Sequence, residues 1–303
     1  MSTLAPATSP PAGPSGPAEP ACVPVGPMLS VFDPFFVGID EYGQAVYLPM
    51  IYRNILIGGE PGAGKSSLLN TLVGHAALSV DVRLCLIDGK QVEFGLWKDA
   101  ADVFVGPDLP HAIRTLRRLQ KVMDNRYAFL LYHRRRKIGP GDVFGVILAA
   151  IDEIAYFSAT AGDKKDQELF SALLRDIVSR GRAVGIIVAA ATQRPSSDII
   201  PPSLRDLFAW RFAGRCTNDV SSDIVLGHGW AARGYSSNTI DPNNQGVGYL
   251  IGEGGTPQLV KAAYLADTDI IRLADYATWT RRRTGLTATT EPAPTGRTLR
   301  SAA

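Results

Sequence analysis

Short runs of consecutive apolar residues alternate with stretches of helical spacing through the middle of the chain. Four such runs are Asn54–Ile57, Val82–Lys90, Val143–Glu153 and Gly185–Pro195, and polar or charged residues stand at or next to the end of the last three. Apolar positions three and four apart predict helices between them, above all at Pro110–Leu131 and Asp166–Arg182. Because apolar strands that alternate with helices form a parallel sheet covered on both faces, we predict an α/β fold. Ligands then belong at the carboxyl ends of the strands.

Two further elements and two tails complete the predicted organisation. Residues Phe36–Leu48 alternate around a turn and predict a β-hairpin, and Asp267–Arg283 predicts a last helix. Residues 1–30 are rich in proline and alanine, and residues 284–303 have the same character. Such segments bury little apolar surface, so we expect two disordered tails around one folded domain at 31–283.

Composition narrows the class of protein only a little. The 303 residues are 46% hydrophobic, which supplies a sizeable core, and the net charge of +2 neither requires nor excludes a nucleic-acid partner. Cys22, Cys85 and Cys216 lie far apart and away from the four histidines, which indicates a reduced, metal-free interior suited to the cytosol. The most apolar stretch, Val143–Ile151, is too short for a bilayer span. The N-terminal residues lack the charged region followed by an apolar region that is typical of a signal peptide, so we do not expect one there.

The strongest chemical motif follows the first predicted strand. Residues Gly59–Ser66 spell G-x-x-x-x-G-K-S between a strand and a helix, which is the context that a phosphate-binding P-loop requires. Its glycines let backbone N–H groups point at phosphates, Lys65 reaches the β- and γ-phosphates, and Ser66 ligates magnesium. The alternative is a glycine-rich turn that happens to contain Lys-Ser. The predicted nucleotide contacts are Gly59, Glu60, Pro61, Gly62, Ala63, Gly64, Lys65, Ser66 and Ser67.

Polar residues end two other predicted strands. Asp152 would hold magnesium through water, and Glu153 would polarise the attacking water. The alternative is that both carboxylates only cap the following helix. Gln193 ends the next strand, where its neutral amide could hydrogen-bond the γ-phosphate or the attacking water.

Together these segments resemble the FtsK/SpoIIIE family of DNA translocases, within the wider group of HerA-like ring ATPases. The matching stretches, in chain order, are "GGEPGAGKSSLLN", "RLCLIDGKQVEF" (Arg83–Phe94), "MDNRY" (Met123–Tyr127), "IDEIA", "GRAVGIIVAAATQRPSSDII" (Gly181–Ile200) and "GVGYLIGEG" (Gly246–Gly254). The resemblance implies a RecA-like P-loop NTPase domain at 31–283 that uses ATP and Mg²⁺. It also implies a ring, expected to be hexameric, that threads double-stranded DNA.

The larger members of the family carry N-terminal membrane spans and a C-terminal winged helix, and neither fits here. This short form resembles the plasmid transfer (Tra) proteins of mycelial bacteria, which move double-stranded DNA between cells. The resemblance therefore implies a cytoplasmic motor that a partner protein recruits to the membrane. Chromosome segregation is the alternative role for the same motor.

Two groups of arginines are candidates for further roles. The family completes each active site with an arginine from the neighbouring subunit, and Arg180, Arg182 and Arg215 are the candidates. The basic run His133–Lys137 contains Arg134, Arg135 and Arg136, which could contact DNA phosphates. The trans candidates could instead be solvated cations on helix faces, and the basic run could instead complement the dipole at a helix C-terminus.

Two other classes of function compete with a DNA pump. A nucleotide-gated adaptor would bind DNA or a partner with little turnover, but such a switch does not need the water-activating Glu153 or the Gln193 amide. A GTPase or small-molecule kinase is disfavoured because the chain has no N-K-x-D base-reading motif.

Overall fold

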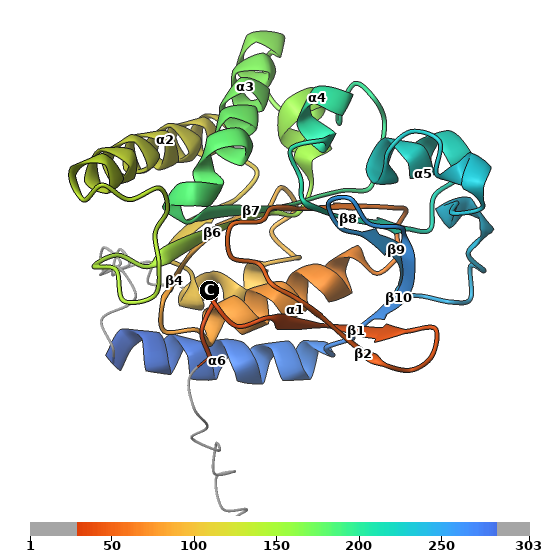
Figure 1. Cartoon of the computed structure of the whole chain (residues 1–303), viewed down its shortest axis with the longest axis horizontal. Helices are drawn as coiled ribbons and strands as arrows, with labels where there is room; N and C mark the ends of the chain where they lie inside the picture. The colour runs from red at the N-terminus through yellow and green to blue at the C-terminus, as the bar shows by residue number, and fades with distance from the viewer. Residues whose placement is uncertain (1–28, 284–303) are drawn as a thin grey trace, which may run out of the picture.

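The computed structural model describes residues 29–283, which form one ten-stranded sheet with helices on both faces (Figure 1). The strand order is β2-β1-β10-β9-β8-β3-β7-β6-β4-β5. Apart from residues 29 and 30, the two predicted tails lie outside the described residues. The predicted α/β fold with a mostly parallel sheet is confirmed.

The strands are β1 (Phe35–Asp40), β2 (Ala45–Leu48), β3 (Ile55–Gly58), β4 (Val82–Ile87), β5 (Val103–Val105), β6 (Val146–Ile151), β7 (Ile186–Thr192), β8 (Trp210–Gly214), β9 (Val247–Ile251) and β10 (Gln258–Ala262). The α-helices are α1 (Lys65–Ala77), α2 (Leu109–Tyr132), α3 (Lys164–Arg180), α4 (Pro202–Arg205), α5 (Asp219–Leu226) and α6 (Asp267–Arg283). Shorter turns of helix include η1 (Gly95–Ala100) and η2 (Tyr156–Thr160).

The parallel half of the sheet runs from β8 to β5. Strand β3 pairs in parallel with β7 on one side and β8 on the other, and β6, β4 and β5 continue the sheet beyond β7. Every residue of β3 and β7 is buried, as expected of strands covered on both faces. The carboxyl ends of β3, β6 and β7 therefore meet at one edge of the sheet, where Gly59, Asp152 and Gln193 follow them.

The other four strands are antiparallel. Strand β9 pairs with β8, β10 with β9, and the predicted hairpin of β1 and β2 with β10. Asp40 closes the hairpin turn because its carboxylate accepts the Gln44 N–H at 2.8 Å. This half of the sheet curls toward α1 (Figure 1), where the Phe35 ring meets the His75 ring with centroids 6.3 Å apart.

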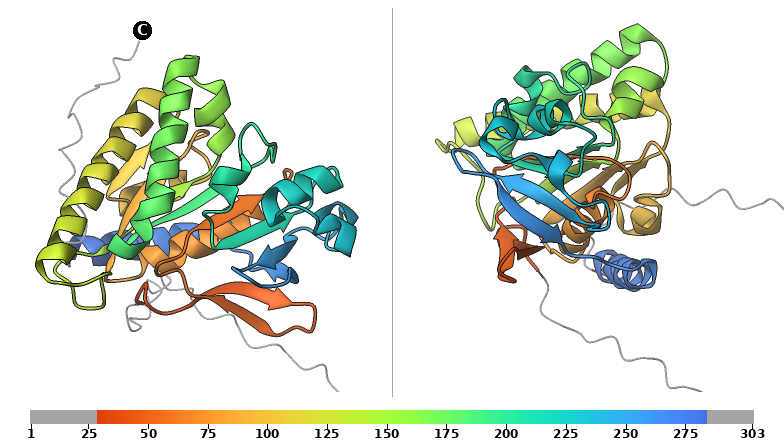
Figure 2. Two further views of the ribbon diagram at one scale, coloured as in Figure 1. Left: turned by 45° about the horizontal axis from the view of Figure 1, so that its top comes forward. Right: turned by 90° about the vertical axis from the view of Figure 1, so that its right-hand side faces the viewer.

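Helices α2 and α3 cover one face of the parallel half, and α1 and α6 lie on the other (Figures 1 and 2). Asp108 caps α2 by accepting the His111 N–H at 2.8 Å. Arg126 fixes the same helix to the sheet because its guanidinium donates to the carbonyls of Val184 and Gly145. Within residues 29–283, no helix has both the length and the apolar character that a bilayer span needs.

The last helix, α6, is held to the sheet by an ion cluster around Arg281. Arg281 of α6 is fully buried, and its guanidinium donates to Asp102 Oδ2 at 2.6 Å and to the Val82 carbonyl at 3.1 Å. Asp102 also accepts from Arg83 Nη1 at 2.9 Å and from the Leu84 N–H at 2.7 Å. One carboxylate thus joins α6, β4 and the segment that enters β5.

Replacing this carboxylate should destabilise the domain strongly. Asp102→Ala removes the carboxylate that the fully buried Arg281 guanidinium contacts at 2.6 Å, so we expect the free energy of unfolding to fall by about 3–5 kcal/mol. The matched control is Asp124→Ala, which removes an exposed partner of Arg180 and should cost less than about 1 kcal/mol. Urea unfolding followed by circular dichroism measures both variants. Equal midpoints for the two would contradict the assigned role of Asp102.

Candidate active site at the sheet edge

The P-loop is fixed between the ends of β7 and β8. The Gly59 N–H donates to the Thr192 carbonyl at 3.3 Å, and the Glu60 N–H donates to the Arg215 carbonyl at 2.8 Å. Gly64 begins α1 with a φ of 89°, and a Cβ there would lie 2.6 Å from the Cα of Gly246. Only glycine fits both that backbone conformation and that approach. The predicted strand, loop and helix therefore form a P-loop as the motif requires.

Lys65 lies folded onto this loop. Its ammonium donates to the carbonyls of Gly59 and Glu60, both at 2.6 Å. Burial lowers the pKa of Lys65 to about 8, while the nearby negative charge of Glu153 acts in the opposite direction. Phosphate oxygens would be stronger acceptors for this ammonium than neutral carbonyls.

Sequence reasoning missed the role of Glu93, which lies next to the P-loop. Ser66 Oγ donates to Glu93 Oε2 at 2.6 Å, and the Asn70 amide donates to Glu93 Oε1 at 2.9 Å. Asp88 shapes the loop that carries Glu93, because its buried carboxylate accepts backbone N–H groups of that loop, including that of Phe94 at 2.8 Å. Glu93 stands in the Arg83–Phe94 stretch that carries the family resemblance, but only the folded loop shows its contact with Ser66.

Asp152 and Glu153 are buried between the ends of β4 and β7. Asp152 Oδ1 accepts the Gly89 N–H at 2.9 Å. Glu153 accepts from Thr192 Oγ1 at 2.7 Å and from the Gln193 N–H at 3.0 Å. It also accepts the Ala155 N–H of the following turn at 3.3 Å. The capping interpretation therefore accounts for only one of the Glu153 contacts, and the others join it to the strand that carries Gln193.

Burial raises the pKa of Asp152 to about 7, and the charges of Asp88 and Glu153 act in the same direction. A nearby cation would favour the ionised form. The Ser66 hydroxyl and the carboxylates of Glu93 and Asp152 are hard oxygen donors, which suit Mg²⁺. No cluster of three or more metal-binding side chains occurs within 29–283, and Mg²⁺ is normally held by only one or two carboxylates together with substrate phosphates.

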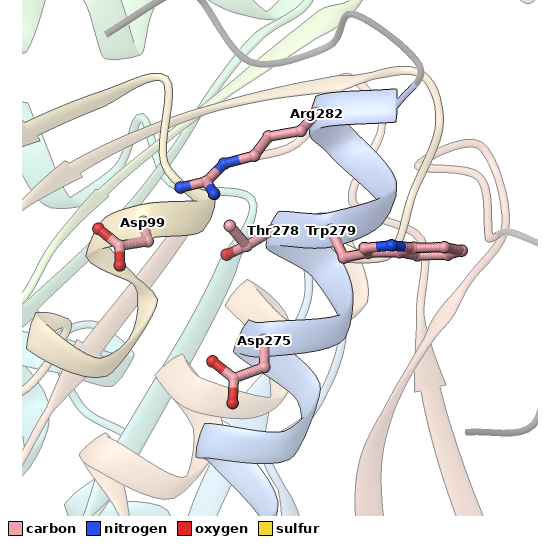
Figure 3. Close-up of a pocket in the computed structure, with 5 residues that line it drawn as sticks. All are labelled: Asp99, Asp275, Thr278, Trp279 and Arg282. Carbon is pink, nitrogen blue, oxygen red and sulfur yellow. The ribbon is translucent and has the colours of Figure 1, made fainter. Parts of the chain in front are cut away.

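A cavity of about 410 Å³ opens over the P-loop. Lys65 and Ser66 line it, Gln193 borders it from the end of β7, and Lys261 and Tyr264 border it from the β10 side. The structure thus brings Gln193 and the P-loop to one cavity. A second hollow of about 360 Å³ lies between η1 and α6. Figure 3 shows its five lining residues, Asp99, Asp275, Thr278, Trp279 and Arg282, with the Trp279 ring turned away from the others.

The three candidate trans arginines occupy two different places. Arg215 follows β8 and pairs with Glu60 of its own P-loop, with 2.7 Å between Arg215 Nη2 and Glu60 Oε2. Arg180 ends α3 and Arg182 lies in the turn between α3 and β7, at the edge opposite the P-loop. Arg180 pairs with Asp176 at 2.6 Å, and Arg182 pairs with Glu253 at 3.0 Å.

The candidate DNA-binding arginines also lie at the edge opposite the P-loop. Arg134, Arg135 and Arg136 are exposed residues just after the end of α2. Arg135 is held by Asp142, with 2.5 Å between Arg135 Nη1 and Asp142 Oδ1. The structure therefore separates this basic run from the nucleotide cavity by the full length of the strands.

Residues 26–145 match the model of the FtsK/SpoIIIE family. Over this stretch, which includes the P-loop, the chain is similar to the FtsK/SpoIIIE family. One relative, the DNA translocase FtsK of Borreliella burgdorferi, is 30% identical over 217 residues, which are 66% of this chain and 27% of the relative. The FtsK of Haemophilus influenzae is 26% identical over 275 residues, 80% of this chain and 51% of the relative. The chain thus spans about a quarter to a half of these FtsK proteins.

Solved structures support the P-loop ATPase fold of the described residues. The pCW3 conjugation coupling protein TcpA, solved as a monomer with ATPγS, superposes with a TM-score of 0.69 at 20% identity, covering 82% of this chain and 71% of TcpA. The cytoplasmic domain of the Thermomonospora curvata type VII secretion ATPase EccC gives 0.65 at 20% identity, covering 84% and 32%. At these identities the likeness establishes the fold alone.

Neutralising Asp152 should stabilise the nucleotide-free protein at high pH. The folded pKa of about 7 exceeds the ordinary value of 3.8, so the stability that the neutral carboxyl provides at low pH is lost as the pH rises from about 4 through 7. The substitution Asp152→Asn would keep an oxygen acceptor for Gly89 without the charge. We expect Asp152→Asn to melt above wild type at pH 8 and close to it at pH 4.

Thermal melts followed by circular dichroism at both pH values test this expectation. The control is Asp99→Asn, because Asp99 is exposed on η1 and its replacement should change neither melting temperature. An Asp152→Asn protein that melts below wild type at pH 8 would show that ionisation of Asp152 does not destabilise the fold.

Proposed function

We propose that the chain is an ATP-driven translocase of double-stranded DNA that moves plasmid DNA between cells. The observation that carries this proposal is the junction of Glu153 with Gln193 beside the P-loop. Glu153 accepts the Gln193 N–H, and Gln193 borders the cavity that Lys65 and Ser66 also line. Glu153, the carboxylate proposed to activate water, is thereby hydrogen-bonded to Gln193, the residue proposed to sense the γ-phosphate.

Each residue of the site has a proposed part in hydrolysis. The P-loop N–H groups and Lys65 hold the β- and γ-phosphates, and Glu153 polarises the attacking water. Bound Mg²⁺ would neutralise phosphate charge, with Ser66 and Asp152 as the residues that hold it. Gln193 hydrogen-bonds the γ-phosphate or the attacking water. When the phosphate leaves, Gln193 loses this hydrogen bond, and the change is transmitted to β7. Glu153, already fixed by Thr192, needs little reorganisation to act.

Several observations support DNA as the transported polymer. The relatives at 25–30% identity are named DNA translocases, and TcpA is named a conjugation coupling protein. Arg134, Arg135 and Arg136 form an exposed basic run that could follow a phosphate backbone without reading sequence. Chromosome segregation is the alternative use of the same motor. The EccC likeness shows that this fold also serves secretion ATPases, so the choice of polymer needs a direct test.

We further propose a ring, hexameric by family analogy, in a cytoplasmic protein docked to the membrane by a partner. Arg180 and Arg182 lie at the edge opposite their own P-loop, so they could reach only a neighbour's nucleotide. Arg215 already contacts its own P-loop through Glu60 and would act from the neighbour only if that pair separated.

Duplex DNA should stimulate ATP hydrolysis more than single strands do. The test is the hydrolysis rate of the purified chain without DNA, with single strands and with several unrelated duplexes over a salt series. Stimulation should fall steeply with salt and depend little on sequence, because phosphate contacts dominate. Equal rates with and without DNA would favour the nucleotide-gated adaptor.

Glu153→Gln should bind ATP normally but hydrolyse it roughly 10²–10⁴-fold more slowly, because the water loses its base.

Mixtures of inactive variants should regain activity if the site is shared between subunits. Lys65→Ala keeps its arginines but loses phosphate binding, whereas Arg180→Ala, Arg182→Ala or Arg215→Ala keeps its P-loop. Loss of a trans arginine should lower the rate by roughly 10³–10⁵-fold. An excess of Lys65→Ala protein should restore turnover only to the variant that lacks the arginine acting in trans. Activity that stays constant per molecule on dilution, with no rescue in any mixture, would exclude a shared site.

A further inference from the structure

The sheet topology separates the two ends of the nucleotide cavity. Strands β7 and β6, which carry Gln193 and the carboxylates Asp152 and Glu153, lie on one side of β3. Strands β8, β9 and β10 lie on the other side. If the γ-phosphate faces Gln193, the nucleoside must leave the P-loop toward β9 and β10. The 410 Å³ cavity extends in that direction, because its lining includes Gln245, Lys261 and Tyr264.

The segment after β10 runs beside the first turns of α1. The Ala263 carbonyl accepts from Thr71 Oγ1 at 3.4 Å, one helical turn beyond Ser67. Gly246 lies so close to Gly64 that a side chain on Gly64 would collide with the Gly246 backbone. These contacts fix the β9 and β10 side of the cavity against the P-loop. Tyr264 therefore borders the same cavity as Ser66 and Ser67 at the start of α1.

Tyr264 lies at this rim with 78% of its surface exposed. An exposed aromatic face beside a polar cavity offers a stacking platform for a flat ring. Lys261 adds a cation on the same side, and Gln245 adds an amide that both donates and accepts. The three residues come from two segments that the antiparallel pairing of β9 and β10 brings together.

We propose that Tyr264, Lys261 and Gln245 form the nucleoside subsite of the ATP site. Tyr264 stacks on the nucleobase, Lys261 attracts the α-phosphate, and Gln245 hydrogen-bonds the base or ribose. The proposal rests on the proposed function, since it assumes that the P-loop holds the triphosphate of a nucleotide. It adds the residues that hold the rest of the nucleotide.

A comparison of two ligands separates this subsite from the phosphate site. ATPγS and inorganic tripolyphosphate both offer phosphates to the P-loop, but only ATPγS has a base. Titration calorimetry of the full chain with Mg²⁺ should show that Tyr264→Ala weakens ATPγS binding roughly 5- to 150-fold and leaves tripolyphosphate binding unchanged. Tyr264→Phe should restore ATPγS binding, because stacking needs the ring and not the hydroxyl. Tyr42→Ala, at an equally exposed tyrosine in the β1–β2 turn, is the control.

Each of the other possible results of this experiment contradicts one specific statement. If Tyr264→Ala binds ATPγS as wild type does but loses DNA binding or self-association, the residue faces a macromolecule and the subsite is wrong. If it loses both ligands equally, Tyr264 supports the loop structurally and is not a stacking platform. If wild type binds tripolyphosphate as tightly as ATPγS, there is no nucleoside subsite, although the phosphate site stands. If wild type binds neither, the proposed function itself fails.

Discussion

The parallel pairing of β3 with β7 and β8 is the constraint on which the site depends. Strand β3 is paired along both edges, and its two neighbours determine where the P-loop lies. Their ends provide the Thr192 and Arg215 carbonyls that accept the first two N–H groups of the loop. A slip of one residue in either pairing would turn buried side chains of β3 toward the opposite layer of helices and break these hydrogen bonds. The position of Lys65 over the sheet edge follows from this register.

Several charged side chains are buried at the same edge of the sheet, and their burial destabilises the fold. Asp88, Asp152, Glu153 and Lys65 are all buried there. Asp88 is satisfied by backbone N–H groups and serves the loop, whereas Asp152 accepts a single N–H and has a strongly raised pKa. A buried carboxylate that is only partly satisfied suits a site that a cation will complete. This difference supports a structural role for Asp88 and the proposed metal-binding role for Asp152.

Much of this arrangement could be predicted from local sequence. The P-loop, the ends of β6 and β7 and the helices α2, α3 and α6 carry strong periodicity or motifs, and the structure has them within a few residues of the predicted bounds. Local patterns do not assign strands β5, β8, β9 and β10. Strand β5 has only three residues, β8 reads Trp-Arg-Phe-Ala-Gly without a clear period, and β9 and β10 are short strands between turns. Their pairing comes from partners far away in the chain, which single-segment patterns do not contain.

The sequence by itself determined the chemistry that this protein can offer: a P-loop with Lys65 and Ser66, two carboxylates after one strand and a glutamine after another. These signals are local, because each motif is read within a dozen residues. Only the tertiary structure decided which other residues meet them. Glu93 reaches Ser66 because Asp88 folds the loop after β4, and Tyr264 reaches the cavity because β10 curls back beside α1. The arginine run after α2 lies at the far edge because a helix that follows a parallel strand returns the chain to the opposite end of the sheet.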